Sequence, residues 1–327
     1  MNRFVFTSGD INGIGPEIAI KVFNVIFPSQ KQKIIYVSPS NIFLKSIENI
    51  KPGFEFEFVK PNLPVDSNPK KISVIDLGEV TADIGKPTKI SGEASIAAIK
   101  TGFDLVSQNK ESALITNPIS KHAFQLAGID FPGHTELLAE WSGVNNFAMM
   151  FLSEEMKCAL ATIHEPLNKV PGLISREALV KKIRLIYDSL RFDFGIGNSK
   201  IAVLGLNPHA GEEGMIGSEE TEIIKPAMKD LNRNNFEGPF VPDAFFANKK
   251  YLDYDVVFGM YHDQVLIPFK MLNFNSGVNF TAGLPIVRTS PDHGTAFDIA
   301  GKNKADYGSL LAAFYWAEKI LNKRNSN

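Results

Sequence analysis

Apolar runs of strand length alternate along the chain with longer segments in which apolar residues recur at helical spacing. The short runs predict strands, because a buried strand reads as a brief apolar stretch bounded by turn residues. Strands are expected at residues 4–7, 34–37, 72–77, 113–116, 147–152, 158–163, 200–206 and 255–259, with an edge strand inside the proline-rich segment 51–71. Helices are expected at 16–27, from 39, from 91, and at 175–192, 219–231 and 305–321. This alternation is typical of an α/β fold with a largely parallel sheet.

The length of the chain, 327 residues, indicates two lobes. At ~150 residues per domain it fits two domains or one large α/β unit. No clean linker, repeat or low-complexity tract divides it. We therefore expect a single two-lobed α/β/α unit over residues 1–327, with one lobe formed by 1–130 and 280–327 and the other by 131–279.

The composition narrows the class of protein. Lys and Arg number 34 against 36 Asp and Glu, so the net charge of −2 gives no electrostatic basis for binding nucleic acid or a membrane surface. A single Cys can form neither an internal disulfide nor a thiolate-rich zinc site, which favours a reducing compartment. The residues after Met1 read as a strand rather than a signal peptide, and no apolar run approaches the ~18 residues that span a bilayer. We expect a cytoplasmic protein.

Polar, glycine-rich and histidine-rich segments directly follow five of the predicted strands. In α/β sheets the carboxyl ends of the strands face the ligand crevice, so five such loops favour an active site at that edge over five unrelated turns. The segments are Gly9-Asp10, 117–121 (NPISK), 164–166 (HEP), 207–212 (NPHAGE) and 261–264 (YHDQ).

Three of these loops carry histidines that form a candidate metal site. His164, His209 and His262 lie 45 and 53 residues apart, and no short motif such as H-E-x-x-H links them. Taken singly, each is readily explained as a ring at a strand end that bonds to the backbone. Taken as a set, they could supply three imidazoles to one divalent cation and leave positions open for substrate. Acidic neighbours could orient the rings: Glu165, Glu212 and Asp263.

Several other positions suit an anion. The turn at residues 9–17 fits neither the dinucleotide nor the P-loop pattern, so a plain tight turn explains it equally well. His134 and Thr135 precede a helix and could donate to a phosphate, although Thr135 could also be a helix cap. Lys270, Asn279 and Arg288 recur at a spacing of nine, and Arg binds phosphates and carboxylates bidentately. For Lys270 alone, a solvated surface charge is the simpler interpretation.

In this order, the motifs resemble those of the 4-hydroxythreonine-4-phosphate dehydrogenase family. The resemblance covers nearly the whole chain and rests on the segments GIGPE, NPISK, GHTE, NPHAGE, PDA, YHDQ and RTSPDHGTAFDIAGK. It implies the fold of isocitrate and isopropylmalate dehydrogenases, which has no Rossmann fingerprint. It also implies NAD-dependent oxidation and decarboxylation of 4-phosphooxy-L-threonine to 3-amino-2-oxopropyl phosphate in vitamin B6 biosynthesis.

The resemblance assigns roles to residues of this chain. It implies a metal at His164, His209 and His262, and a phosphorylated substrate at His134, Thr135, Lys270, Asn279 and Arg288. The loop that begins at His293 would hold the adenosine half of the cofactor, through His293, Gly294, Thr295, Ala296 and Asp298. An acidic Asp298 would accept bonds from ribose hydroxyls and repel a 2′-phosphate, which favours NAD over NADP. In this view, lobe 1–130 with 280–327 is the cofactor side and lobe 131–279 the metal and dimer side.

The family also acts as a homodimer with the active site at the subunit interface. Three His accept Zn²⁺, Co²⁺ or Mn²⁺, and oxygen atoms from substrate would allow Mg²⁺. The chain departs from the family at Asp10-Ile11-Asn12, where an acidic residue, Pro and a small residue are usual, so the role of this loop stays open.

The chemistry expected from these parts is oxidation of a hydroxyl that the metal makes acidic, followed by loss of CO₂ next to the new ketone. Candidates for moving protons are Asp243, Asp263 and Lys270. A related dehydrogenase of threonate or erythronate 4-phosphate is one alternative. A three-His metallohydrolase or a non-catalytic phosphate-binding module is a second alternative, and the 293–302 loop argues against this second alternative.

Overall fold

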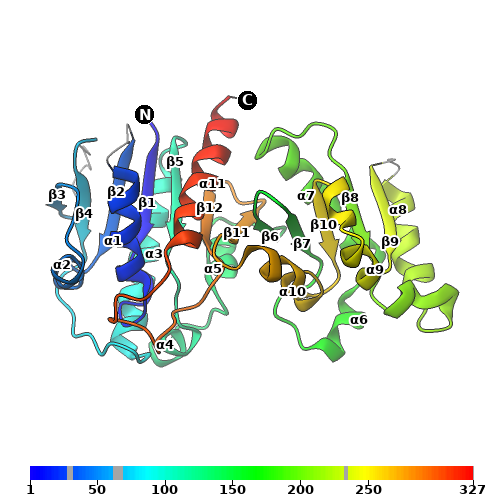
Figure 1. Cartoon of the computed structure of the whole chain (residues 1–327), viewed down its shortest axis with the longest axis horizontal. Coiled ribbons are helices and arrows are strands. Elements are labelled where there is room, and N and C mark those ends of the chain that lie inside the picture. Colours follow the sequence, from blue (N-terminus) through cyan, green and yellow to red (C-terminus); the bar gives the residue numbers. More distant parts are fainter. Residues whose placement is uncertain (28–31, 62–68, 232–234, 327) are drawn as a thin grey trace. The chain divides into compact units, whose positions relative to one another are not determined.

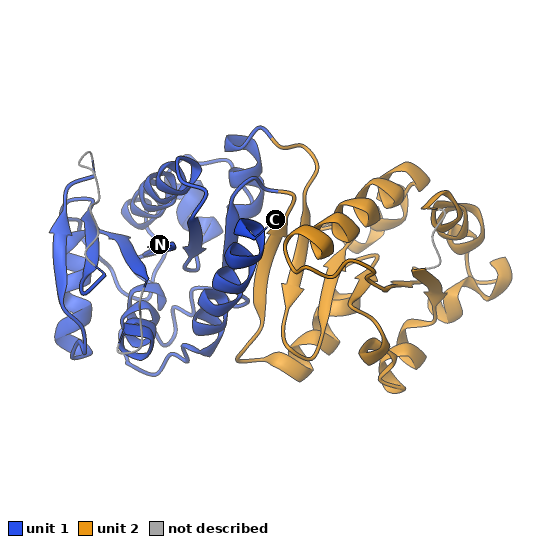
Figure 2. Cartoon of the chain, turned by 90° about the horizontal axis from the view of Figure 1, so that it is seen from above, with its two compact units in different colours: residues 1–143, 284–326 blue, residues 144–283, 327 orange. Residues whose placement is uncertain are grey.

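The predicted alternation of strands and helices is present in the computed structural model of the chain, which describes residues 1–27, 32–61, 69–231 and 235–326 (Figure 1). The chain separates into two units: unit 1 comprises residues 1–143 and 284–326, and unit 2 comprises residues 144–283 (Figure 2). The two ends of the chain bracket an inserted middle segment, so unit 1 is discontinuous in sequence.

Unit 1 is built on parallel strands in the order β3 (Phe56–Val59), β4 (Ile72–Asp76), β2 (Lys33–Ser38), β1 (Arg3–Thr7), β5 (Ser112–Thr116) and β12 (Val287–Pro291). Alternate side chains of β1 point to opposite faces, as the strand period requires. Phe4 and Phe6 pack on Phe314, and Phe6 also packs on Phe23. On the other face, Gly102 lies against β1 and β5. The helices α1 (Gly15–Ile26) and α11 (Gly308–Asn325) therefore cover one face and α3 (Lys89–Ser107) the other.

Shorter helices complete unit 1: α2 (Ser40–Asn49), α4 (Lys121–Leu126) and α5 (His134–Trp141). The structure places α5 in unit 1, whereas the sequence put the lobe boundary near residue 130. The physical reason is packing, because Trp141 contacts Phe103 and lies under the Lys100 ammonium, both on α3. The second boundary falls after Gly283 rather than near residue 280.

Unit 2 has a mixed sheet in the order β11 (Val278–Ala282), β6 (Ala148–Leu152), β7 (Lys157–Leu160), β10 (Val256–Gly259), β8 (Ile201–Leu204) and β9 (Phe236–Phe240). The pairs β11–β6 and β6–β7 are antiparallel, and the remaining pairs are parallel. Its helices are α6 (Val170–Leu173), α7 (Arg176–Phe192), α8 (Lys225–Leu231), α9 (Pro242–Ala247) and α10 (His262–Asn273). The expected mixed, largely parallel α/β sheet is confirmed.

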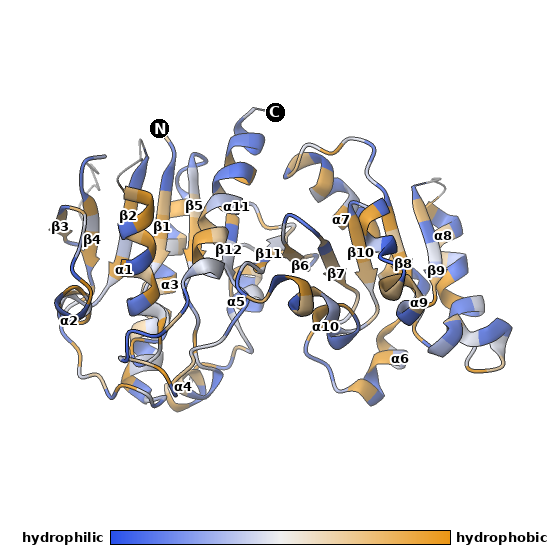
Figure 3. Cartoon of the chain, in the orientation of Figure 1, coloured by the Kyte–Doolittle hydropathy of each residue, from blue (hydrophilic) through white to orange (hydrophobic). Residues whose placement is uncertain are grey.

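Apolar residues concentrate in the central strands (Figure 3). Every residue of β5, β6, β8 and β10 is buried, which matches strands covered on both faces. In the described part of the chain, no helix combines the length and the apolar character that crossing a membrane requires.

Local hydrogen bonds explain where the predicted element boundaries were wrong. The helix α3 begins at Lys89 rather than Ser91, because the Thr88 and Ser91 side chains form a reciprocal capping box. The helix α11 begins at Gly308 rather than near 305, since the Ala305 amide donates to Glu17 and the Gly308 amide to Asp306. The helix predicted over 219–231 opens with a π-helical turn, Glu220–Ile224, before α8.

Candidate functional site

The polar loops that follow the strands gather in two sets, one in each unit. In unit 1 they follow the adjacent parallel strands β1 and β5, and the Asn117 side chain donates to the carbonyl of Thr7 at 2.8 Å to join them. In unit 2 they follow β7, β10 and β8, which are also parallel neighbours. The predicted clustering at carboxyl strand ends therefore holds within each unit.

Two of the three candidate metal ligands come together. The imidazole rings of His164 and His262 have centroids 5.6 Å apart and are tilted by 38°. Two imidazoles on one tetrahedral cation, with bonds of ~2.1 Å, have ring centres about 5 Å apart. The separation of the two ring centroids is close to that value, and imidazole nitrogens are ligands that divalent cations accept. His164 has a positive φ of 52°, a conformation uncommon outside glycine.

The His262 ring is fixed by its neighbours. Its Nδ1 lies 2.6 Å from Asp263 Oδ1, and its ring packs edge-on against Phe151. His262 is the first residue of α10, so the helix carries it at the end of β10. A carboxylate on one ring nitrogen fixes the tautomer and leaves the other nitrogen for a metal, which gives Asp263 the orienting role expected of it.

His209 lies at the end of β8, the strand next to β10, in an exposed turn. Among the described residues, no group of three or more His, Cys, Asp and Glu side chains is arranged to hold a metal ion. The structure therefore brings His164 and His262 together and does not gather His209 with them in one chain.

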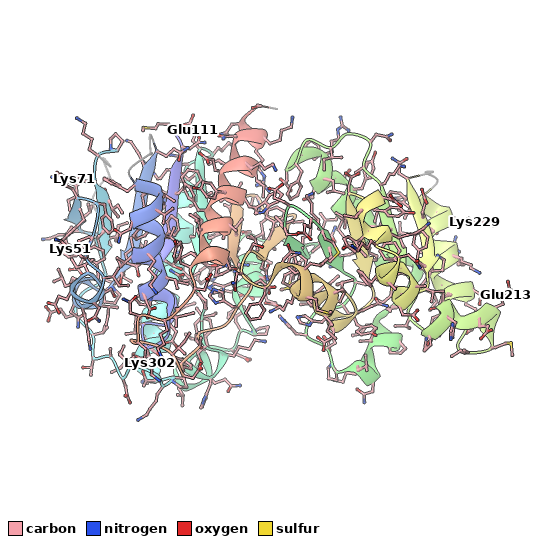
Figure 4. The ribbon with its side chains drawn as sticks, in the orientation of Figure 1. Lys51, Lys71, Glu111, Glu213, Lys229 and Lys302 are labelled. Carbon is pink, nitrogen blue, oxygen red and sulfur yellow. The ribbon has the colours of Figure 1, made fainter. Side chains whose placement is uncertain are left out.

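The turn that carries His209 has an unusual backbone. Five successive residues, 209–213, have positive φ between 40° and 78°. Left-handed conformations cost about 1–2 kcal/mol for each residue with a side chain, so the four non-glycine residues here cost about 4–8 kcal/mol. The Glu213 side chain at the end of the turn points away from the fold (Figure 4). Such strain is maintained only where surrounding contacts enforce it, and it is typical of functional sites.

Unit 1 contains a buried cation. Arg288 lies in β12 with only 2% of its surface exposed, and burial lowers its pKa to about 9, an effect that Glu136 partly opposes. Its Nε and Nη2 donate to Thr116 Oγ1, the last residue of β5, at 3.1 and 2.8 Å. Thr116 is not among the candidate residues that the sequence indicates, because a single threonine at a strand end carries no distinctive signal.

His134 and Thr135 lie in the same unit, in the first turn of α5. Gly133 is the N-cap, so the alternative interpretation of Thr135 as the helix cap is wrong. Burial, together with the positive charge of Arg288, lowers the pKa of His134 well below its usual value, and the ring is neutral at neutral pH. Its buried Nε2 has no hydrogen-bond partner among the described residues. The arrangement offers an incoming anion both a cation and an unused imidazole nitrogen.

The other two candidate substrate ligands lie in unit 2. Lys270 is half-buried on α10, two turns after His262, and Asn279 lies in β11. The side-chain Oδ1 of Asn279 is buried and has no partner within the described chain. A buried amide oxygen without a partner is costly, so it is available to a ligand that brings a donor.

The candidate cofactor loop packs on the β1–α1 turn. The Ile14 amide donates to the Thr295 carbonyl at 3.0 Å, and a Cβ on Gly13 would lie 2.8 Å from that oxygen. Ala296 has a positive φ of 41°, and Asp298 is exposed. The same loop continues to Lys302, whose side chain points outward in Figure 4. A cavity of about 270 Å³ adjoins it, lined in part by Ile11, Gly13, Ala300 and Gly301.

Asn12, where the chain departs from the family, has a defined role. Its side chain accepts from the Asp83 amide and donates to the Lys86 carbonyl, both at 2.9 Å. Asp10 accepts from the Asn12 amide and from Ser91, and burial raises the pKa of Asp10. The loop thus fixes segment 83–88 beside the cofactor loop, a role that sequence analysis left open.

Of the candidate proton carriers, Asp263 is held by His262 and its side chain is 71% exposed. Asp243 is exposed in the first turn of α9. Lys270 is the more buried of the three.

Comparison with known proteins supplies the family context. Residues 30–317 match the family model described as pyridoxal phosphate biosynthetic protein PdxA. The chain is 41% identical over 328 residues to 4-hydroxythreonine-4-phosphate dehydrogenase of Sulfurihydrogenibium sp., with 99% of each chain covered. The crystal structure of 4-hydroxythreonine-4-phosphate dehydrogenase from Klebsiella pneumoniae matches with a TM-score of 0.84 and 34% identity over 98% of both chains. Isocitrate dehydrogenase from Methylococcus capsulatus matches in fold, with a TM-score of 0.51 and 14% identity over all of this chain and 87% of that one.

Proposed function

The chain belongs to the family of the pyridoxal phosphate biosynthetic protein PdxA, and from this premise we propose that it is a 4-hydroxythreonine-4-phosphate dehydrogenase. It oxidises 4-phosphooxy-L-threonine with NAD and releases CO₂ to give 3-amino-2-oxopropyl phosphate, a step of vitamin B6 biosynthesis in the cytoplasm. The family relatives, which are dehydrogenases, support an oxidoreductase.

The observation that carries the substrate class is the buried Arg288, whose positive charge acts on the buried His134. A guanidinium taken out of water binds an anion strongly, because the anion restores the solvation that burial removed. Thr116 holds one edge of the guanidinium, and Nε2 of the neutral His134 ring can donate or accept one further bond. We assign the phosphorylated substrate to these two residues together with Thr135, Lys270 and Asn279.

A divalent cation at His164, His209 and His262, either Zn²⁺, Co²⁺ or Mg²⁺, would make the substrate hydroxyl more acidic and polarise the ketone that replaces it. The substrate loses a hydride to NAD and the hydroxyl proton to a base. The resulting β-keto acid loses CO₂, and the carbon left behind takes up a proton. Asp263 orients the His262 ring. We therefore assign proton transfer to the half-buried Lys270, with Asp243 as the exposed alternative.

NAD is assigned to the loop that holds His293, Gly294, Thr295, Ala296 and Asp298. The positive φ of Ala296 and the packing of Thr295 on the β1–α1 turn fix the loop backbone. The adjoining cavity of about 270 Å³ gives the adenosine half a place beside it. The exposed Asp298 carboxylate favours ribose hydroxyls over a 2′-phosphate.

We also propose that the protein is a homodimer with the active site at the subunit interface. On α10 and at its C-cap, Ile267, Met271 and Phe274 are 59%, 81% and 80% exposed at positions i, i+4 and i+7. This apolar stripe lies on the helix that begins at His262, and burying each side chain contributes up to about 1.5–3 kcal/mol. In such a dimer, His209 of a second copy supplies the third imidazole to the His164–His262 pair.

Subunit complementation tests this arrangement. His209→Ala and His262→Ala variants are each expected to lose bound metal and turnover as homodimers. Unfolding and refolding them together should restore activity to about one quarter of the wild type, because half of the dimers are mixed and each has one intact site. No recovery in a mixture shown by mass to contain mixed dimers would refute shared sites.

The proposed reaction is tested by NADH formation with metal added or chelated. Formation with 4-phosphooxy-L-threonine, together with release of CO₂, is the expected result. Faster turnover of threonate or erythronate 4-phosphate would show that one of these compounds, rather than 4-phosphooxy-L-threonine, is the substrate. Metal-dependent hydrolysis without formation of NADH would show that the protein is a metallohydrolase and not a dehydrogenase. Binding without turnover would indicate a phosphate-binding module.

A further inference from the structure

The left-handed turn at 209–213 is held from one side by a buried carboxylate. Glu220 is completely buried at the start of the π-helical turn that precedes α8. Its Oε1 accepts from the backbone amides of Leu206 and Asn207, both at 2.7 Å. Its Oε2 accepts from the Asn207 side-chain amide at 2.9 Å. All three donors belong to the two residues directly before Pro208 and His209.

The turn also packs on this carboxylate. A Cβ on Gly211 would lie 2.6 Å from Glu220 Oε2, so only glycine fits between the turn and the carboxylate. The Ala210 amide donates to the Asn207 carbonyl at 3.1 Å, which starts the left-handed path. In the described part of the chain, no Lys or Arg pairs with Glu220, and its charge is balanced by the three N–H donors.

The second nearby carboxylate is arranged differently. Glu219 Oε2 accepts from the Asn207 side-chain amide at 2.7 Å, and it is only part-buried. In the described structure no backbone amide of residues 206–213 donates to Glu219, whereas two donate to Glu220. The end of β8 is thus fixed by Glu220, and Glu219 shares only the side-chain contact.

We propose that Glu220 is a positioning residue that determines the position of the His209 imidazole. The inference rests on the proposed assignment of His209 to the metal. His209 is exposed, so its place is determined by the path of the backbone that carries it. That path leaves β8 at the two amides bound to Glu220 and turns left-handed over the same carboxylate. Weakening the hydrogen bonds to Glu220 therefore shifts the His209 imidazole, although Glu220 does not contact the ring.

The test is Glu220→Gln in the full-length protein, with Glu219→Gln as the matched control. Gln keeps the size of the side chain and one acceptor oxygen, but its Nε2 cannot accept from the Asn207 amide or carry the negative charge. We expect the affinity for Co²⁺, titrated by its visible absorption, to fall roughly 10-fold or more, as for other residues that orient ligands. The control, Glu219→Gln, is expected to change the Co²⁺ affinity less than about 3-fold, because Glu219 contacts only the Asn207 side chain. Amide exchange at 206–213 should quicken only in Glu220→Gln.

Asn207→Ala is the second variant, in case Glu220→Gln does not fold. It removes the side-chain donor and leaves both backbone bonds to Glu220, so its Co²⁺ affinity should fall by less than that of Glu220→Gln but by more than that of the control. If the wild type binds Co²⁺ and folded Glu220→Gln binds it equally well, the positioning role is overturned. If the wild type binds no Co²⁺, the metal assignment of His209 is overturned, and this inference falls with it.

Discussion

Two N–H groups of the buried Arg288 donate to the Thr116 hydroxyl, and replacing Thr116 with Val tests what that hydroxyl does. Val has nearly the same shape as Thr but cannot accept the two hydrogen bonds at 3.1 and 2.8 Å. A hydrogen bond to a charged group contributes about 1.5–3 kcal/mol, so the pair represents about 3–6 kcal/mol if nothing moves. The guanidinium recovers part of this by shifting, and we expect a loss of about 2–4 kcal/mol in unfolding free energy.

The same shift should impair recognition of the anion. Thr116 fixes the edge of the guanidinium that carries Nε and Nη2. Without this contact the guanidinium shifts, and its N–H groups no longer align with the oxygen atoms of the phosphate or carboxylate. We expect KM for the phosphorylated substrate to rise at least ~10-fold, the equivalent of about 1.4 kcal/mol. KM for NAD should stay within about 2-fold, because the cofactor is assigned to a different loop.

Urea denaturation and initial rates of NADH formation measure the two effects. Thr116→Ser keeps the hydroxyl and should stay within about 1 kcal/mol of the wild type, with an unchanged substrate KM. A Thr116→Val protein that is destabilised but binds substrate with unchanged KM would show that Thr116 is only structural. That result would refute the link between this hydroxyl and the substrate.

Three further predictions follow from the structure. Burial and the charge of Arg288 hold the pKa of His134 below its usual value of 6.5, so below pH 6.5 the unfolded chain takes up a proton that the native ring does not. The free energy of unfolding should therefore fall as the pH drops below 6.5, by up to about 1.4 kcal/mol per pH unit. In urea denaturation measured across pH, His134→Asn should flatten this part of the profile. Asn12→Ala releases segment 83–88 and should raise KM for NAD several-fold, with KM for the substrate unchanged. Asn24→Ala breaks an equivalent pair of hydrogen bonds to the backbone far from the cofactor loop, and it should change neither KM. Asp298→Ser should reduce the preference for NAD over NADP in kcat/KM, and an unchanged ratio would remove Asp298 from cofactor selection.

The sequence predicted the strands that are nearly continuous apolar runs and missed β9, β11 and β12, in which polar or turn residues interrupt the run. The strands β5 and β10 are continuous apolar runs, and both were predicted. In β12, the buried positions include Arg288, Thr289 and Ser290, which break the apolar pattern, and the strand was missed. The strand β9 contains a Gly-Pro pair and exposed residues, so it has no strand pattern.

The candidate site was predicted as residue types, whereas the contacts that fix those residues were not. Thr116 and Arg288 lie 172 positions apart, and Asn12 and Asp83 lie 71 apart. Such pairs depend on the strand order of the sheet, which periodicity in one sequence does not encode. Glu220 was hidden for another reason, because a buried acid within the run Glu219-Glu220-Thr221-Glu222 looks like the solvated face of a helix.

These exceptions to local rules fall beside the residues to which we assign function. Three features each oppose folding when taken alone: a buried cation in a strand, five left-handed residues in succession, and a buried carboxylate that has no cationic partner among the described residues. Arg288 is itself assigned to substrate, the left-handed turn carries His209, and Glu220 holds that turn in place. A chain under selection for stability alone would replace these residues with apolar ones or with a regular turn. Their combined cost is therefore the strongest physical reason to place anion recognition at Arg288 and metal binding at the end of β8.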